Sequence, residues 1–482
     1  MFVPENRISS VSFETTKIYN NSSMAQSGFI AVIDLGTSNI SGVIGRRNEN
    51  NVISVLHHAS LSSENSIRRG VIYNIEKAGA IVNKLIKLLE NRMDVKIGKV
   101  YVSLGGQSVL TIIEKEEIKL PPESGMVPVE VIDSLVDEAK KLQPDLRMNY
   151  AVSDVEYFLD DKPELNPVGV TCKHVEAIFR IVVGRPNLFK NIQAVIEKSN
   201  VKIAGYIISA IASADIVLTD EEKDLGCAFI DMGAGTTDVV VYKGGILRHM
   251  VTIPFGGKNI TRDIEGLNFV ESDAESYKIK FGKAKDNNEG FVFSSPFSSP
   301  FSAKPDIDLV ELNKVIVMRL DEITANIKEQ IRISDYMDEL GAGIVVSGGA
   351  SQLKNIDLYL NQKFNMPVRL ASARKNFVNN ASELVADPSK STLLGMLLKG
   401  KDNCELEKPK EPVFSTEAED EYSTTNGDNR GTKRWGFFST NKDSTEKKDT
   451  PKQPKSSKGD KGKFGDAMKD MFSSIFEDPD DN

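Results

Sequence analysis

A short phosphate-loop pattern occurs twice in this chain, and it restricts the possible fold more than any other feature. The first copy runs from Phe29 to Ser38 and the second from Cys227 to Thr237. In each copy an apolar strand ends in an aspartate, a tight turn of glycine and hydroxyl residues follows, and a second strand continues the chain. Glycines allow a sharp turn, and successive N–H groups in such a turn bind anions. The sequence therefore predicts two β-hairpins built to hold a phosphate.

The residue types in the two turns suit phosphate groups with a bound Mg²⁺. The side chains of Asp34 and Asp231 are at strand ends, where a carboxylate can hold Mg²⁺ through its water molecules. Glycines for the close approach and hydroxyl donors follow at Gly36, Gly233, Gly235, Thr37, Ser38, Thr236 and Thr237. A single pattern of this kind often marks a plain turn. Two copies, each after an apolar strand, favour a phosphate site.

Composition limits the class of protein. The chain has 482 residues, enough for two or more domains, and its net charge of -9 argues against a general nucleic-acid binder. Its 3 cysteines are too few for a disulfide framework, which indicates a reducing compartment. No apolar run is long enough to span a membrane. We expect a cytosolic protein unless another segment brings it to a surface. Residues 1–27 are polar and predict a disordered leader, or a true start at Met24.

Between the two loops the pattern changes. The segment from Ile75 to Leu89 has apolar residues at helical spacing and predicts an amphipathic helix on a sheet. A different block begins at Lys99 and ends in the strand-like 173–183, so we predict an inserted α+β subdomain over 98–183. Helices are predicted over 129–142, 187–199, 207–218, 258–265, 271–281 and 309–336. The Ser/Pro/Phe repeat within 286–305 predicts a mobile loop, or a contact for a partner through its phenylalanines.

A third glycine signal runs from Ile344 to Ser351, after a buried strand. It would suit a backbone that passes flat against a nucleotide base or sugar, although an ordinary strand-to-helix turn has the same pattern.

The C-terminal part has the composition of a disordered tether. Residues 401–463 contain few apolar side chains, and the segment is acidic up to 429 and basic from 430. Residues 464–477 then predict an amphipathic helix of about 20 Å, too short to span a bilayer but suited to its interface. Its lipid-facing residues are Phe464, Met468, Met471, Phe472, Ile475 and Phe476. The alternative is a helix that docks in a groove on a partner or on this protein.

The three glycine signals, in this order, resemble the actin-like ATPase superfamily, and within it the FtsA family of bacterial cell division. The closer resemblance rests on segments 218–226, 253–264 and 274–282 and covers about 29–399. It implies an α/β, actin-like (ribonuclease H-like) two-lobed ATPase fold, with the insertion at 98–183 as the family's 1C subdomain. Lobe I would comprise 28–97, 184–222 and 370–400, lobe II 223–260 and 335–369, and the 2B subdomain 261–334.

The resemblance also implies site residues. The first phosphate loop would include Gly36, Thr37, Ser38 and Asn39, and the second Gly233, Ala234, Gly235, Thr236 and Thr237. Asp34 and Asp231 would serve Mg²⁺. Gly348, Gly349 and Ala350 would line the adenosine, and Glu275 with Lys278 would contact its ribose and base. A solvated i,i+3 ion pair is the alternative for Glu275 and Lys278.

Two departures from the family pattern concern hydrolysis. Ala234 stands where relatives usually have a glycine, and Ile208, Ser209 and Ala210 stand where many relatives place a glutamate. Without that carboxylate, we expect ATP to be a structural switch that is hydrolysed slowly.

As a function, the resemblance implies a peripheral protein on the cytoplasmic side of the inner membrane at the division septum. It would bind ATP, self-associate and tether the tubulin-like protein FtsZ, whose C-terminal peptide would bind 261–334. Other division proteins would be partners, and nucleic acid would not. A PilM- or MreB-type scaffold is the alternative, and a sugar kinase of the same fold is a further one, although we identify neither a catalytic base nor a sugar pocket.

Overall fold

The computed structural model describes residues 28–121, 125–142, 146–284 and 308–406. The predicted leader 1–27, the Ser/Pro/Phe loop 286–305, most of the linker and the terminal helix 464–477 lie outside these residues. No helix of the described residues is long and apolar enough to cross a membrane.

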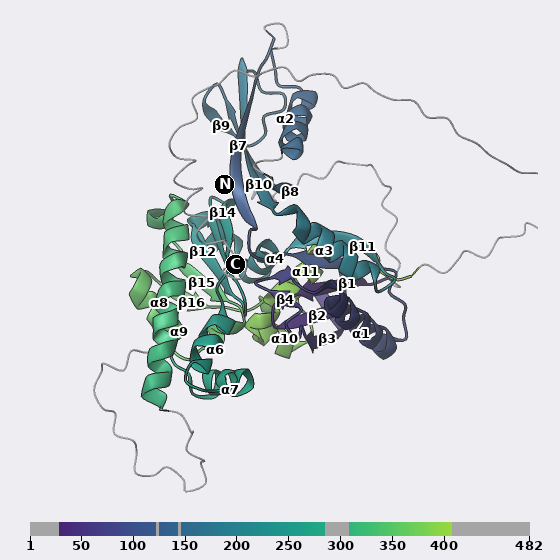
Figure 1. The fold of residues 1–482 in the computed structure, drawn as a ribbon. Helices are drawn as coiled ribbons and strands as arrows, with labels where there is room; N and C mark the ends of the chain where they lie inside the picture. Colours follow the sequence, from purple (N-terminus) through teal and green to yellow (C-terminus); the bar gives the residue numbers. More distant parts are fainter. Residues whose placement is uncertain (1–27, 122–124, 143–145, 285–307, 407–482) are drawn as a thin grey trace, which may run out of the picture. The chain divides into compact units, whose positions relative to one another are not determined.

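A five-stranded sheet forms the core of lobe I (Figure 1). Its order is β11 (Lys202–Ile208), β6 (Lys99–Leu104), β1 (Ile30–Leu35), β2 (Asn39–Arg47) and β3 (Ile53–Ser62). The predicted first hairpin is present, because β1 and β2 pair antiparallel from Ile30↔Gly45 to Leu35↔Ile40. Strand β6 runs parallel to β1. The predicted boundary of the insertion at 98 is therefore too early: β6 is a strand of lobe I, and its apolar alternation alone could not show which sheet it joins.

Helices cover both faces of this sheet. Helix α1 (Ile75–Met93) begins at Asn74, whose side chain accepts a hydrogen bond from the Lys77 N–H, and its buried stripe packs on β2 and β3. Helix α3 (Pro186–Glu197) packs beside it. The other face contacts α11 (Ser391–Lys399), which packs closely on α4 (Ser209–Val217). Gly395 permits this approach, since a Cβ there would lie 2.0 Å from the Ala212 carbonyl oxygen.

The second sheet has nine strands and repeats the same plan. Its lobe II part is ordered β16 (Val368–Leu370), β15 (Ile344–Ser347), β12 (Cys227–Met232), β13 (Thr237–Lys243) and β14 (Ile246–Ile253). The predicted second hairpin is β12 with β13, and β15 runs parallel to β12 as β6 does to β1. Each lobe therefore presents a hairpin turn beside a parallel strand.

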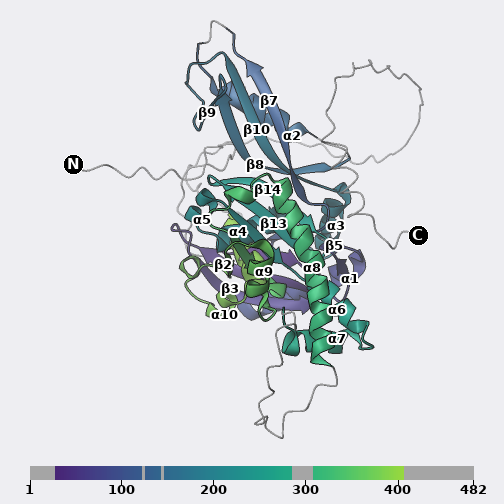
Figure 2. The same cartoon turned by 90° about the vertical axis from the view of Figure 1, so that its left-hand side faces the viewer.

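The inserted block extends this second sheet past β14 (Figure 2). It contains β7 (Leu110–Lys119), β10 (His174–Gly184), β8 (Met148–Leu159) and β9 (Lys162–Glu164), with α2 (Val129–Lys141) against them. One residue pair, Val251↔Leu110, joins the insertion to lobe II in the ladder.

The remaining helices confirm the periodicity of the second half. Helix α6 (Gly257–Glu265), α7 (Glu271–Phe281) and α8 (Leu309–Ile333) agree with the predicted segments within a few residues, and α8 packs on α6, β13 and β14. The structure also contains the short elements β4 (Ile67–Arg68), β5 (Val71–Ile72), α5 (Asp220–Leu225), α9 (Ile356–Phe364) and α10 (Ser382–Ala386).

The start of the predicted disordered tether is ordered. Cys404 is fully buried, its N–H donates to the Phe29 carbonyl at 2.7 Å, and its own carbonyl accepts from the Gly98 N–H at 2.9 Å. The Leu406 N–H donates to the Lys96 carbonyl at 2.8 Å. The prediction of disorder is thus wrong for 401–406, because backbone pairing with lobe I orders a segment whose composition is polar.

Candidate functional site

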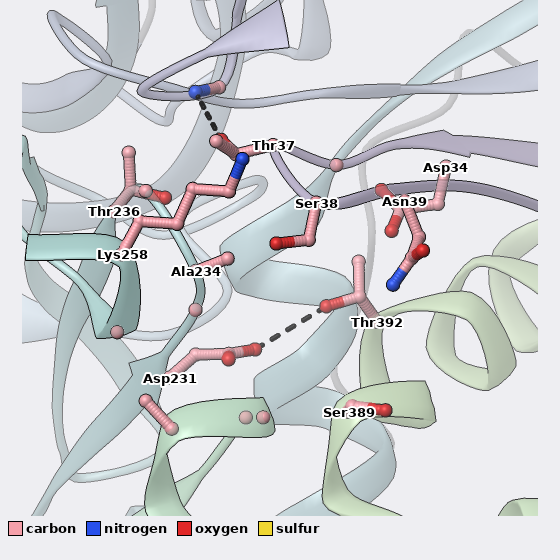
Figure 3. Close-up of a pocket in the computed structure, with 18 of the residues that line it drawn as sticks. Asp34, Thr37, Ser38, Asn39, Asp231, Ala234, Thr236, Lys258, Ser389 and Thr392 are labelled. Atoms are coloured by element: carbon pink, nitrogen blue, oxygen red, sulfur yellow. Dashed lines mark hydrogen bonds between the residues drawn. The ribbon is translucent and has the colours of Figure 1, made fainter. Parts of the chain in front are cut away.

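A cavity of about 470 Å³ lies between the two hairpin turns (Figure 3). It is lined by residues from both sheets and from the ends of α4, α6, α7 and α11. The predicted site residues that line it are Asp34, Gly36, Thr37, Ser38, Asn39, Asp231, Gly233, Ala234, Gly235, Thr236, Glu275, Lys278, Gly348, Gly349 and Ala350.

Thr237 is the predicted nucleotide-binding residue that does not line the cavity. Its side chain is fully buried at the first position of β13, and its hydroxyl donates to the Phe255 carbonyl at 2.9 Å. The prediction of a phosphate-facing hydroxyl at Thr237 is therefore wrong. The two threonines at 236 and 237 look alike in sequence, and the strand pleat decides that they point in different directions.

The first loop is held from outside by three segments of lobe I. The Leu35 N–H donates to Ser103 Oγ at 2.8 Å, and the Gly70 N–H donates to Thr37 Oγ1 at 2.9 Å. The Ser63 N–H donates to the Ser38 carbonyl at 2.9 Å. These contacts fix the shape of the turn. The backbone N–H groups of Thr37 and Ser38 take no part in them and have no protein acceptor among the described residues. The turn is thus prepared to donate to an anion.

The second loop is held by the start of α6. The N–H groups of Gly257 and Lys258 donate to the carbonyls of Gly233 and Ala234 at 3.0 and 2.7 Å. Within the described chain, the N–H groups of Ala234, Gly235 and Thr236 have no protein acceptor. The two loops touch each other, since a Cβ on Gly235 would lie 2.6 Å from the Thr37 side chain. Only glycine fits at 235 with the loops this close.

Three aspartates gather at the floor of the cavity. Ser213 Oγ and Thr392 Oγ1 donate to Asp231 Oδ2 at 2.6 and 3.3 Å, and the second of these bonds is drawn in Figure 3. Burial raises the pKa of Asp34 to about 6, against a hydrogen bond from Ser103, and the charge of Asp231 raises it further. Burial and the charge of Asp231 raise the pKa of Asp238 to about 7. Burial also raises the pKa of Asp231 itself. A cation placed here would relieve this repulsion.

The predicted adenosine contacts also line the cavity, beside the second loop. Lys278 Nζ lies 2.7 Å from Glu275 Oε2, so the i,i+3 ion pair exists, but Lys278 also donates to the Gly257 carbonyl at 2.9 Å and to Thr261 Oγ1 at 2.8 Å. Burial lowers the pKa of Lys278, and Glu275 opposes that shift. The pair is partly enclosed and faces the cavity, so it is not the fully solvated pair of the alternative interpretation. Gly348 has φ +89°, and a Cβ there would lie 2.3 Å from Asp231 Oδ1.

Several lining residues were missed by the sequence analysis. They are Ile72, Gly70, Ser103, Gly105, Gly106, Ser209, Asp238, Lys258, Gln352, Ser389, Lys390 and Thr392. Asp238 follows the second loop directly and could have been found from that position. The sequence around Ser389 contains no pattern that predicts a ligand contact. Ser389 reaches the site because it lies just before the start of α11. Ser209, one of the three residues at which the resemblance leads us to expect a glutamate, lines the cavity.

The site can bind a polyanion with a divalent cation. N–H donors and hydroxyls face one another across the two loops, and carboxylates lie beneath them. Among the described residues, no group of three or more His, Cys, Asp or Glu is arranged to hold a metal ion directly.

Comparison with known proteins shows the family of this chain. A family model described as "Cell division protein FtsA" matches residues 228–395. The chain is 32% identical to the cell division protein FtsA of Porphyromonas gingivalis over 333 residues, which covers 67% of this chain and 68% of that protein. This chain belongs to the FtsA family. The FtsA proteins of Neisseria meningitidis and Escherichia coli are 29% and 27% identical, and each match covers 77% of this chain and 90% of the relative.

The fold of this FtsA family member is also found in a solved structure. The PilM-PilN type IV pilus biogenesis complex has a chain that superposes with a TM-score of 0.53 at 15% identity, covering 77% of this chain and 98% of that one. This likeness concerns the fold alone. It agrees with the two-lobed, actin-like α/β architecture predicted from the doubled hairpin, and the family membership makes the chain a cell division protein.

Proposed function

We propose that this FtsA family member binds ATP with Mg²⁺ in the cavity, associates with copies of itself, and tethers FtsZ filaments to the cytoplasmic membrane at the division septum. The observation that carries the proposal is the contact between two glycine-hydroxyl turns, one from each lobe, at Gly235 and Thr37. A phosphate chain between them would bind both lobes at once and close the cleft.

The polar groups that line the cavity match the successive parts of an ATP molecule. The loop N–H groups would bind the phosphates, and Mg²⁺ would be held through water above Asp34, Asp231 and Asp238. The Glu275–Lys278 pair and the backbone at Gly348–Ala350 would hold the ribose and base. When bound, Mg²⁺ would neutralise charge between phosphate groups.

Slow hydrolysis is part of the proposal. Ser209 begins α4 at the position of the missing glutamate, and its hydroxyl donates weakly to the Leu104 carbonyl at 3.4 Å. A hydroxyl there is a poor base for water activation. Steady-state turnover well above about one per second would contradict the switch-like role.

Nucleotide binding can be tested with two changes in one loop. Gly235→Ala places a methyl group against Thr37, whose Oγ1 is already bonded to Gly70, so the loops must separate. We expect at least about a tenfold loss of affinity for Mg·ATP by titration calorimetry, as for loss of one good contact. Ala234→Gly is the matched control and should bind at least as tightly as the unmodified chain. Equal binding by all three proteins would reject the loop assignment.

The 2B region contains a surface that supports the proposed FtsZ contact. Val310, Lys314 and Met318 lie at i, i+4 and i+8 of α8, and the two apolar side chains are 60% and 64% exposed. Such a stripe can receive an apolar segment of a peptide. Val310→Glu with Met318→Glu should remove binding of an FtsZ C-terminal peptide, measured by fluorescence anisotropy. Leu358→Glu, on exposed α9, is the control. Unchanged binding by the double variant would place the peptide elsewhere, and no binding by the unmodified chain would undermine the FtsZ proposal.

Membrane tethering is assigned to the predicted helix 464–477, with the basic segment upstream adding attraction to anionic lipid. Phe472→Asp on its apolar face should abolish co-sedimentation with anionic liposomes, as should truncation after Lys463. Ser473→Asp adds the same charge on the polar face of the helix. This variant should still bind the liposomes, with slightly lower affinity. Undiminished binding after truncation would refute the helix as the anchor and favour its docking on a protein.

A further inference from the structure

Lys258 connects the two lobes across the cavity. It is the second residue of α6 in lobe II, and its Nζ donates to Asn65 Oδ1 of lobe I at 2.9 Å. Its side chain is partly exposed and lines the cavity. Figure 3 shows this side chain directed from the second loop toward the first, where Thr37 lies.

Both ends of this bridge are bonded to the phosphate loops. On the lobe II side, the Lys258 N–H donates to the Ala234 carbonyl. On the lobe I side, Asn65 belongs to the 63–66 turn, in which Ser63 donates through its N–H to Ser38 and through its hydroxyl to the Thr37 carbonyl. The ammonium group of Lys258 therefore lies beside the turn that supports the first phosphate loop, whereas Lys278 Nζ is bonded to the Gly257 carbonyl.

Of the three lysines that line the cavity, Lys258 has its charge compensated less closely than Lys278 does. Lys278 is bound to Glu275 at 2.7 Å, and Lys390 acts electrostatically on Asp34. Lys258 is bound to a neutral amide, and its nearest carboxylate, the half-exposed Glu271, lies 3.7 Å away. An ammonium has three donors, so after the bond to Asn65 donors remain for an anion.

We propose that Lys258 recognises the terminal phosphate of ATP and, through its bond to Asn65, couples that phosphate to closure of the two lobes. This inference rests on the nucleotide binding proposed above. The loop N–H groups would serve the phosphates that ATP and ADP share. Lys258 reaches past the second loop to the turn that supports the first, where only the longer phosphate chain of ATP extends.

The test compares two nucleotides on the full chain. Lys258→Gln keeps an N–H donor on a side chain one bond shorter and removes the charge. We expect its affinity for Mg·AMPPNP to fall about 10- to 100-fold, the range for a charged hydrogen bond, while its affinity for Mg·ADP stays within about threefold. Calorimetric titration measures both. Lys280→Gln, an exposed position on α7, makes the same charge change and should leave both affinities unaltered.

A second variant separates the phosphate contact from the bridge. Asn65→Ala keeps the ammonium but removes its lobe I partner, so AMPPNP affinity should fall less than in Lys258→Gln. Thermal melting without nucleotide verifies that each variant is folded. An equal loss for ADP and AMPPNP in Lys258→Gln, or no loss for either, would overturn the role of Lys258. If the unmodified chain binds neither nucleotide, the proposed ATP site is wrong as well.

Discussion

The aspartates beneath the two phosphate loops are the residues whose charge affects the stability of the protein most. Asp34 and Asp238 have pKa values raised to about 6 and about 7 by burial and by the charge of Asp231. In the unfolded chain both would titrate near 3.8. Between about pH 4 and pH 7 the folded state therefore holds more protons than the unfolded state, and the free energy of unfolding falls as pH rises. The nucleotide-free protein is strained by these charges at neutral pH, and a bound cation would remove the strain.

Asp238→Asn tests this account. The amide keeps the oxygen that accepts from Thr252 Oγ1 at 2.6 Å but carries no charge. At pH 8 we expect the nucleotide-free variant to be more stable to urea by up to about 4 kcal/mol, at about 1.4 kcal/mol per unit of pKa shift. Near pH 3 the gain should vanish, because the aspartate is then protonated in the folded state and largely so in the unfolded one.

The same variant should bind Mg·ATP more weakly at pH 8, since a carboxylate facing the cation is lost. Asp161→Asn, at an exposed turn, is the control and should change neither stability nor binding. A variant that is less stable than the unmodified protein at pH 8 would show that the charge of Asp238 is compensated in the folded state.

Among the elements, the short segment 401–406 is part of the folded body even though it begins the charged tether. Its Asn403 Oδ1 accepts from the Phe29 N–H at 3.1 Å, and the N–H groups of Lys401 and Asp402 donate to the Tyr101 hydroxyl. The segment thus closes the end of β1 and β6. Composition predicted disorder here because it does not record which backbone groups find partners in another strand.

Two truncations measure what this segment contributes. Ending the chain after Gly400 removes the buried Cys404 and its backbone hydrogen bonds, and should reduce the free energy of unfolding by about 2–4 kcal/mol, at about 1 kcal/mol per hydrogen bond plus the burial term. Ending it after Leu406 should leave stability unchanged. Equal urea midpoints for the two truncated chains would mean that 401–406 contributes nothing to the fold.

At the scale of the whole molecule, the insertion is joined to lobe II by charge as well as by the sheet. Glu156 on β8 lies 2.6 Å from Arg180 on β10 and 2.7 Å from Arg248 on β14. The Arg180 side chain is only 5% exposed, and its Nε and Nη1 have no hydrogen-bond partner among the described residues. The Leu247 N–H of β14 also donates to Asp154 of β8 at 3.1 Å. This polar cluster connects the inserted strands to β14. Because β14 leads into the turn at Gly256 and then into α6, the cluster also connects the insertion to the second phosphate loop.

Glu156→Gln should loosen that junction. It leaves the charge of Arg180 buried without a counterion, so we expect a loss of about 2–4 kcal/mol in the free energy of unfolding. Hydrogen exchange should increase in β7, β8 and β14 more than in β1 and β2. Glu176→Gln on β10 removes a different ion pair, that with the half-exposed Lys115, and should cost less than about 1 kcal/mol. Exchange that rises uniformly over both lobes would argue against a local junction.

The sequence by itself determined the local elements and the chemistry of the two turns. The doubled hairpin, the third glycine signal and the helices α1, α7 and α8 are readable because glycine conformation, strand burial and helical periodicity act over a few residues. Of the predicted nucleotide-binding residues, all but Thr237 line the cavity.

Tertiary structure alone decided the partners of each element. It assigned β6 to lobe I, turned Thr237 away from the cavity, ordered 401–406, and brought Thr392 and Lys258 to the site. Each of these outcomes depends on pairing between residues far apart in the chain, which no local pattern encodes. The two turns predict a phosphate site separately, and only the packing of α4 against α11 and of Gly235 against Thr37 makes them one site.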